Sequence, residues 1–132
     1  MRVFINFFLP VFWAVVMIAL FTMPPSATPN VPHFEGFDKL VHCGVFFVFT
    51  SLLLHSIILN SRKSARKINS CLWVFIVATS FAFLTEGIQY FLTKSRQADW
   101  WDIFADMVGI GMAIFAFLLF FYKRSEAPNK SN

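Results

Sequence analysis

Apolar residues form four long runs along the chain, and short polar or turn-rich breaks separate them. The runs cover residues 3–23, 40–59, 68–92 and 100–122. Each run has close to the ~20 residues that an α-helix needs to cross the hydrocarbon core of a bilayer, which is about 30 Å thick. The alternating pattern of ~10-residue barrel strands is not seen in the sequence. The pattern therefore predicts an all-α fold, a four-helix transmembrane bundle.

The same pattern predicts one membrane domain over residues 1–124 and a short polar cytoplasmic tail over residues 125–132. The first run also has features of a signal peptide, because Arg2 precedes it and Pro25-Ser26-Ala27 follow it near a cleavage point. Its apolar core of about 20 residues is longer than the usual core of about 7–15 residues. We therefore expect a retained helix, which mass spectrometry of the mature N-terminus would test.

Composition supports the membrane assignment, because 58% of the residues are hydrophobic and only 14% are charged. Soluble domains average about 45–50% apolar and about 25% charged residues. A soluble fold of this length could not bury so much apolar surface, and a disordered chain would have the opposite composition. The net charge of +4 does not indicate nucleic acid, since the basic residues adjoin the apolar runs. We therefore expect the lipid bilayer as a partner and no nucleic acid.

Lysine and arginine positions predict the orientation, because the cytoplasmic loops of membrane proteins are rich in both residues. With the N-terminus in the cytoplasm, eight basic residues lie inside: Arg2, Arg62, Lys63, Arg66, Lys67, Lys123, Arg124 and Lys130. Only three lie outside: Lys39, Lys94 and Arg96. This bias predicts that both termini are cytoplasmic.

Acidic residues have the opposite distribution, which the positive-inside rule does not require. Six of the seven fall on the outer side or in the outer half of the membrane: Glu35, Asp38, Glu86, Asp99, Asp102 and Asp106. Glu86 and Asp106 each lie about six residues from the outer end of a predicted helix, roughly 9 Å deep. A carboxylate near the bilayer centre costs about 2.5–3.5 kcal/mol, so such groups turn into the bundle and find partners.

Polar residues on three predicted helices recur at spacings of three and four, which places them on one helical face. The sequence therefore predicts one polar pocket, built from Asp38, Lys39, His42, Glu86, Gln89, Arg96, Asp99, Asp102 and Asp106. A structural alternative stays open, in which interhelical hydrogen bonds of these groups simply hold the helices together. In that interpretation Asp38 and Asp99 are N-caps, and Gly109 and Gly111 allow close helix packing.

A metal site is a further alternative, since His42 and two or three carboxylates have the donor types that bind a divalent cation. Lys39 and Arg96 in the same region argue against a cation. We therefore expect no metal and no cofactor.

Three motifs give the chain a resemblance to a known family. They are Asp38-Lys39-Leu40-Val41-His42, Glu86-x-x-Gln89 and Arg96-x-x-Asp99-x-x-Asp102-x-x-x-Asp106-x-x-Gly109. In this order and spacing they resemble the VanZ-like family of small bacterial integral membrane proteins, over about residues 5–122. Asp106 departs from the family pattern, because asparagine is expected there in many relatives. A carboxylate favours proton sharing or cation binding more than an amide does.

The resemblance implies a multi-pass protein of the bacterial cytoplasmic (inner) membrane that acts at its outer face, near cell-wall precursors. The founding member of the family is linked to teicoplanin resistance, but no such role follows for this chain from its residues. We expect the pocket to bind or process a cell-envelope substrate that is amphiphilic or lipid-linked. In this hypothesis Glu86 or Asp106 is a general base, His42 is a proton shuttle, and Lys39 and Arg96 bind phosphate or carboxylate groups.

Two other functions are alternatives to substrate binding. Intramembrane carboxylates are typical of proton relays and small transporters, although the ionisable residues here stop halfway across the membrane. A non-catalytic structural membrane partner is the second alternative. The sequence has no recognisable nucleophile motif, so it leaves open whether the chain is an enzyme, and it also leaves open the oligomeric state.

Overall fold

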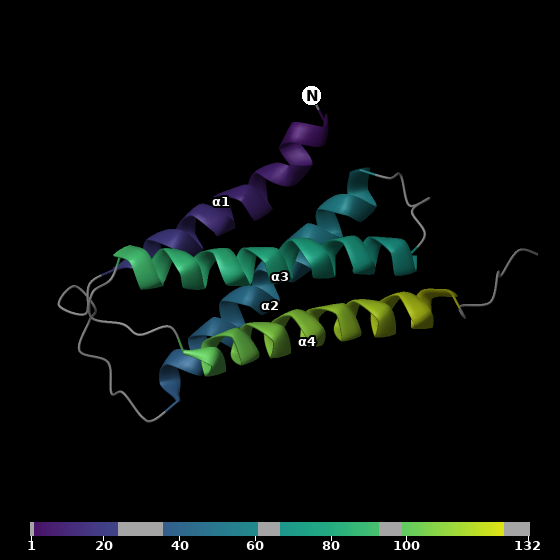
Figure 1. Cartoon of the computed structure of the whole chain (residues 1–132). Helices are drawn as coiled ribbons and strands as arrows, with labels where there is room; N and C mark the ends of the chain where they lie inside the picture. The colour runs from purple at the N-terminus through teal and green to yellow at the C-terminus, as the bar shows by residue number, and fades with distance from the viewer. Residues whose placement is uncertain (1, 24–35, 61–66, 93–98, 126–132) are drawn as a thin grey trace, which may run out of the picture.

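The computed structural model of the chain describes residues 2–23, 36–60, 67–92 and 99–125 (Figure 1). These ranges contain four helices and no strand, which confirms the all-α fold class. The helices are α1 (Arg2–Thr22), α2 (Phe37–Asn60), α3 (Lys67–Leu92) and α4 (Trp100–Ser125). Each begins and ends within three residues of its predicted apolar run.

The four helices run alternately up and down the bundle (Figure 1). One end of the bundle holds the first turn of α1, the last turn of α2, the first turn of α3 and the last turn of α4. The opposite end holds the last turn of α1, the first turn of α2, the last turn of α3 and the first turn of α4. The two termini of the described chain therefore lie at the same end.

Three helices are long and apolar enough to cross a membrane, over Phe37–Asn60, Ile68–Leu92 and Trp100–Phe120. The apolar segment Asn6–Thr22 of α1 is shorter. Large apolar side chains also face outward along the bundle, with Phe91 82% exposed and Ile68 78% exposed. Exposed apolar surface of this extent is typical of a protein solvated by lipid. These features are those of a multi-pass membrane protein.

Small residues let α3 approach its neighbours. Val74, Ala78 and Ala82 recur every four residues along one face of α3 and are almost completely buried. They pack in one core with Phe46 of α2 and Ile110 of α4. Since apolar burial does not drive helix association in lipid, close van der Waals packing of this kind is what stabilises the bundle.

Gly109 allows a close backbone contact between α2 and α4. A Cβ atom at this position would overlap the backbone carbonyl of Cys43 in α2, so any side chain here would push the helices apart. The prediction that Gly109 is a packing residue is confirmed. The same prediction for Gly111 is wrong, because Gly111 is exposed and a Cβ there would have nothing within 4 Å. Residues two apart on a helix point to different sides, so the two glycines cannot serve the same contact.

Pro10 lies inside α1 and is buried. A proline has no backbone N–H, so the carbonyl four residues earlier, that of Asn6, loses its usual helical donor. The hydroxyl of Ser56 in α2 donates a hydrogen bond of 2.7 Å to this carbonyl. The bond satisfies a polar group that lipid could not satisfy, and it ties α1 to α2.

The starts of α2 and α4 differ in their capping. Asp99 is the N-cap of α4, as predicted, because its Oδ1 accepts a 3.0 Å bond from the backbone N–H of Trp101. The N-cap prediction for Asp38 is wrong, because α2 begins at Phe37 and Asp38 lies in its first turn. Gly36 precedes the helix with a φ of 91°, a conformation that suits glycine, and its carbonyl accepts the N–H of Leu40.

Candidate functional site at the polar end of the bundle

The deepest polar contact joins α2 to α4. Nδ1 of His42 and Oδ1 of Asp106 lie 3.0 Å apart, and the two side chains are only 1% and 0% exposed. The ring of Phe21 from α1 stacks on the imidazole, with ring centroids 4.3 Å apart and planes 14° apart. Three helices therefore fix the position of the His42 ring.

Lys39 makes a second, shallower contact between the same helices. Its ammonium lies 3.2 Å from Oδ2 of Asp99 and 3.6 Å from Oδ1 of Asp102. The lysine and Asp99 side chains are each about two-fifths exposed, whereas the Asp102 side chain is 11% exposed. Because its charge already faces two carboxylates, Lys39 is poorly placed to bind the phosphate of a ligand.

Asp99 is an ionisable residue that lies just before the first residue of α4, outside the apolar helices. The N–H of Trp101, and then the ammonium of Lys39, hold the pKa of the Asp99 carboxyl below its usual value. Both interactions favour the charged form of the carboxyl. Asp99 is therefore an anion at neutral pH, bonded both to its own helix and to α2.

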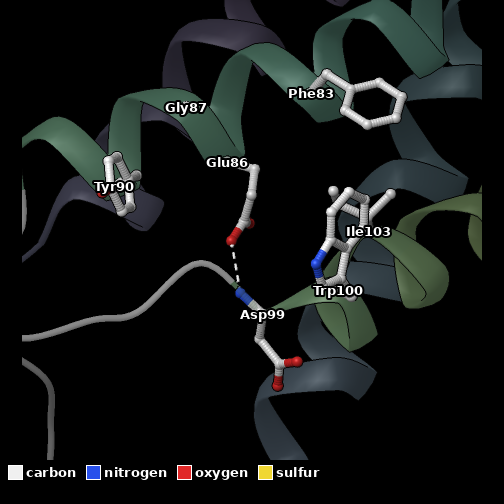
Figure 2. A pocket seen from close by; sticks show the side chains of 7 residues that line it. All are labelled: Phe83, Glu86, Gly87, Tyr90, Asp99, Trp100 and Ile103. Carbon is white, nitrogen blue, oxygen red and sulfur yellow. Dashed lines mark hydrogen bonds between the residues drawn. The ribbon is translucent and has the colours of Figure 1, made fainter.

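Glu86 connects α3 to the start of α4. Its Oε1 accepts a 3.0 Å hydrogen bond from the backbone N–H of Asp99. Figure 2 shows this bond beside a groove between the two helices, with Phe83, Tyr90 and Trp100 around the carboxylate. The groove has a volume of about 250 Å³. Its lining is largely apolar, but a buried carboxylate lies within it.

Gln89 is buried on the same face of α3 as Glu86, but the hydrogen bond that it donates goes to α1 and not to an acidic side chain. Its Nε2 donates a 3.2 Å hydrogen bond to the carbonyl of Phe21, in the last turn of α1. The last carbonyls of a helix have no helical donor, so this bond caps α1 from a neighbouring helix. The bond is of the structural kind that the alternative interpretation predicts. Arg96 lies outside the described residues.

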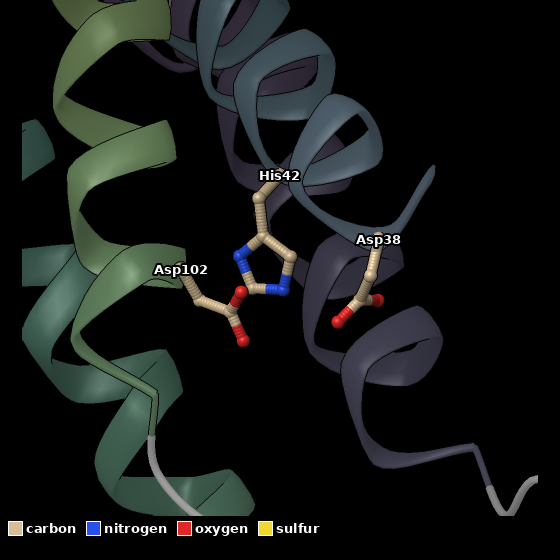
Figure 3. Close-up of side chains that lie close together, drawn as sticks. All are labelled: Asp38, His42 and Asp102. Carbon is tan, nitrogen blue, oxygen red and sulfur yellow. The ribbon is translucent and has the colours of Figure 1, made fainter. Parts of the chain in front are cut away.

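Asp38, His42 and Asp102 form a compact group at the mouth of the α2–α4 contact. One donor atom from each lies within 4.8 Å of the other two. Figure 3 shows the His42 ring between the two carboxylates, with Asp102 on α4 and Asp38 one helical turn before His42 on α2. These are nitrogen and oxygen donors of the kind that bind divalent cations.

Several buried polar atoms at this end have no hydrogen-bond partner among the described residues. They are Nε2 of His42, Oε2 of Glu86, Oδ1 of Asp102 and Oδ2 of Asp106. A buried donor or acceptor without a partner costs about 1–3 kcal/mol. Groups placed only to hold helices together would be expected to satisfy one another. The unsatisfied atoms therefore favour a ligand-binding site over a purely structural role.

Two contributors to this end are not evident from the sequence pattern. Phe21 is one of 19 phenylalanines, and nothing in its spacing predicts contact with His42. Trp100 looks like an interfacial aromatic residue, but it also forms one wall of the Glu86 groove. The spacing of Glu86 and Tyr90 suggests a shared buried face, yet Tyr90 is 62% exposed although it lines the groove.

Comparisons with known proteins add no relative: no protein-family model, curated protein or solved structure matches the chain. The class that the structure defines is therefore an all-α membrane bundle with its buried ionisable groups at one end.

Proposed function

We propose that this chain is a VanZ-like multi-pass protein of the bacterial cytoplasmic membrane that binds the headgroup of an amphiphilic, lipid-linked cell-envelope substrate. The observation that carries the proposal is the groove between α3 and α4, in which Glu86 is surrounded by apolar and aromatic side chains. A site of this kind matches a molecule with a polar head and an apolar tail.

The chemistry of the groove favours a headgroup that donates hydrogen bonds. Oε1 of Glu86 is already bonded to the backbone of Asp99, while Oε2 is buried without a partner. A carboxylate oxygen accepts N–H or O–H donors. The aromatic rings of Phe83, Tyr90 and Trp100 line the same groove, and aromatic faces attract cations such as ammonium groups. An amine or hydroxyl group on the substrate is therefore the best match.

The distribution of basic residues supports an outward-facing site. α2 ends and α3 begins at the end of the bundle away from Glu86, and the sequence between these two helices contains Arg62, Lys63 and Arg66. Since basic connections remain in the cytoplasm, the Glu86 end faces the outside of the cell. Lipid-linked envelope substrates in the outer leaflet would reach the groove laterally from the bilayer.

Photocrosslinking tests the proposal directly. The probes are phosphatidylethanolamine with a diazirine in one acyl chain, and the same lipid with its amine acetylated. We expect Trp100→Leu and Glu86→Gln to lower crosslinking of the amine lipid about fivefold, the change that ~1 kcal/mol of cation binding implies. Trp101→Leu is the matched control, because Trp101 is exposed next to Trp100 but does not line the groove. Equal labelling of all variants, or equal labelling by the two lipids, would contradict the proposal.

A proton relay is a second candidate, and the buried contact of His42 with Asp106 favours it. The ionisable pair is fully enclosed, as in proton paths of membrane proteins. Towards the other end of the bundle, however, the buried polar residues described are Thr50, Ser56 and Ser70. None of these hydroxyl groups titrates near neutral pH. Proteoliposomes with an internal pH dye separate the two functions. If the chain is a proton relay, Asp106→Asn should abolish proton movement. If it only binds a headgroup, the wild type moves no protons and the substitution changes nothing.

A further inference from the structure

We propose that Asp38, His42 and Asp102 bind a divalent transition-metal ion of the Zn²⁺ type. Asp38 and His42 come from the first two turns of α2 and Asp102 from the first turn of α4, and each places one donor atom within 4.8 Å of the others. The site lies between α2 and α4, whereas the Glu86 groove lies between α3 and α4. The metal site therefore stands whether or not a lipid binds in the groove.

The free ring nitrogen of His42 is the observation that points to a ligand. The residue is 1% exposed, and its Nε2 is buried without a hydrogen-bond partner among the described residues. Figure 3 shows the ring directed between the carboxylates of Asp38 and Asp102. Oδ1 of Asp102 is also buried and makes no hydrogen bond, and its nearest cationic group is the Lys39 ammonium at 3.6 Å. An ion bound between Nε2 and Asp102 would give the His42 nitrogen its missing partner.

Asp106 contacts the other ring nitrogen of His42, the one that does not face the proposed ion. Metal-binding histidines nearly always use their other ring nitrogen to donate to a carboxylate, which fixes the tautomer and the ring orientation. Oδ1 of Asp106 lies 3.0 Å from Nδ1 of His42, so Nε2 is left free to bind metal. The stacked ring of Phe21 restricts rotation of the imidazole further. The His42 ligand is therefore preorganised before any ion arrives.

Lys39 does not block this site. The sequence suggests that a nearby ammonium would replace a cation, but the closest carboxylate to Lys39 is Asp99 at 3.2 Å, outside the group of three. The distance to Asp102 is longer, at 3.6 Å. Lys39 can therefore stay paired with Asp99 while Asp102 turns to the ion.

The donor set favours zinc-like ions over calcium or magnesium. One imidazole and two carboxylates make three protein ligands, the number that leaves a fourth, open position in tetrahedral zinc sites. Calcium and magnesium prefer six or more oxygen ligands. With metal–ligand bonds of about 2.0–2.2 Å, ligand atoms of a tetrahedral site lie about 3.3 Å apart. The half-buried Asp38 side chain already has an interaction of its own, which it would exchange for the ion as the group closes.

Cobalt titration of the full-length chain tests the inference. The protein is purified in detergent, its affinity tag is removed, and it is stripped with a chelator. Co²⁺ is then added while the visible absorption of the bound ion is followed, with Zn²⁺ as competitor. We expect one equivalent of metal per chain. Asp38→Asn should weaken Co²⁺ binding at least about tenfold, because it replaces one carboxylate oxygen with an amide NH₂ group and removes the negative charge of the ligand.

Two further variants separate ligand roles from structural ones. Asp106→Asn should weaken Co²⁺ binding by about 10–100-fold and shift the Co²⁺ spectrum, because the Asp106 carboxylate orients the His42 ring without touching the ion. His55→Gln is the matched control, since His55 is an exposed histidine on the same helix as His42. It should leave affinity within about twofold of wild type. Absence of saturable binding to the wild type, or equal affinity in the Asp38 variant, would overturn the site.

Discussion

His42 and Asp106 lie 64 residues apart in the sequence, yet their side chains meet where neither contacts solvent. The pair joins α2 to α4 one turn away from Gly109, where an added Cβ atom would overlap the backbone of Cys43 in α2. A buried polar contact and a close backbone contact therefore reinforce the same helix pair. The predictions below test the interactions that hold this end of the bundle together.

Replacement of Asp106 should show whether the carboxylate is needed for its charge or only as an acceptor. Asp106→Asn keeps an oxygen for Nδ1 of His42, so we expect the free energy of unfolding to fall by less than about 1 kcal/mol. Asp106→Leu leaves the imidazole unpaired and should cost about 1–3 kcal/mol. Unfolding in a denaturant series in detergent measures both. Equal losses in the two variants would show that the hydrogen bond is not what matters.

The two glycines of α4 provide a matched pair for helix packing. Gly109→Ala places a methyl group against the backbone of Cys43, and we expect a loss of at least about 1–3 kcal/mol as the helices separate. Gly111→Ala meets nothing within 4 Å and should be neutral or stabilise the helix by up to about 1 kcal/mol. Thermal melting followed by circular dichroism distinguishes them, and a harmless Gly109→Ala would refute the close contact.

Ser56 should matter only because Pro10 is present. Ser56→Ala removes the hydrogen bond to the carbonyl of Asn6, and we expect a loss of about 0.5–1.5 kcal/mol. In a Pro10→Ala background the restored N–H supplies the missing donor, so the same serine substitution should cost much less. A double-mutant cycle measures the coupling. Additive effects would mean that the serine and the proline act independently.

Asp99 should make bundle stability depend on acidic pH. The charged carboxyl is favoured in the folded chain, so its pKa is lowered relative to the unfolded value near 3.8. Its stabilising effect is therefore complete above that value and is lost as the pH falls through the lowered pKa. Asp99→Asn retains the N-cap but should flatten this acid dependence, whereas Asp99→Ala should also lower the melting temperature at neutral pH. Melting curves at several pH values test both.

The sequence predicted the helices well because a bilayer imposes their length. About 20 apolar residues are required for a span, so the run of residues 68–92 already has the bounds of α3 within one residue. The prediction was less accurate at the start of α2, which is Phe37 rather than residue 40, and at the end of α4, which is Ser125 rather than residue 122. Asp38 and Lys39 are polar but helical, and an apolar run cannot include them.

Spacing also predicted which faces turn inward, but not which atoms meet. Asp102 and Asp106 are buried on one face of α4, as a spacing of four implies. The same spacing rule places Gly109, three residues after Asp106, on this buried face, and it excludes Gly111, which is five residues after Asp106. In contrast, the bond from Gln89 to the carbonyl of Phe21 depends on how α1 ends beside α3. Contacts of this kind follow from the packing of whole helices, which the periodicity of one helix does not define.

The chain order of the buried pair has a consequence for biosynthesis. A ribosome makes α2 before α4, so His42 is already in the membrane when Asp106, 64 residues later, leaves the exit tunnel. The most deeply enclosed carboxylate thus enters the bilayer last, when its histidine is in place to receive it. Arrival of the acid after the histidine that pairs with it shortens the time for which an unpaired carboxyl group faces lipid, and it links the insertion of α4 to that of α2.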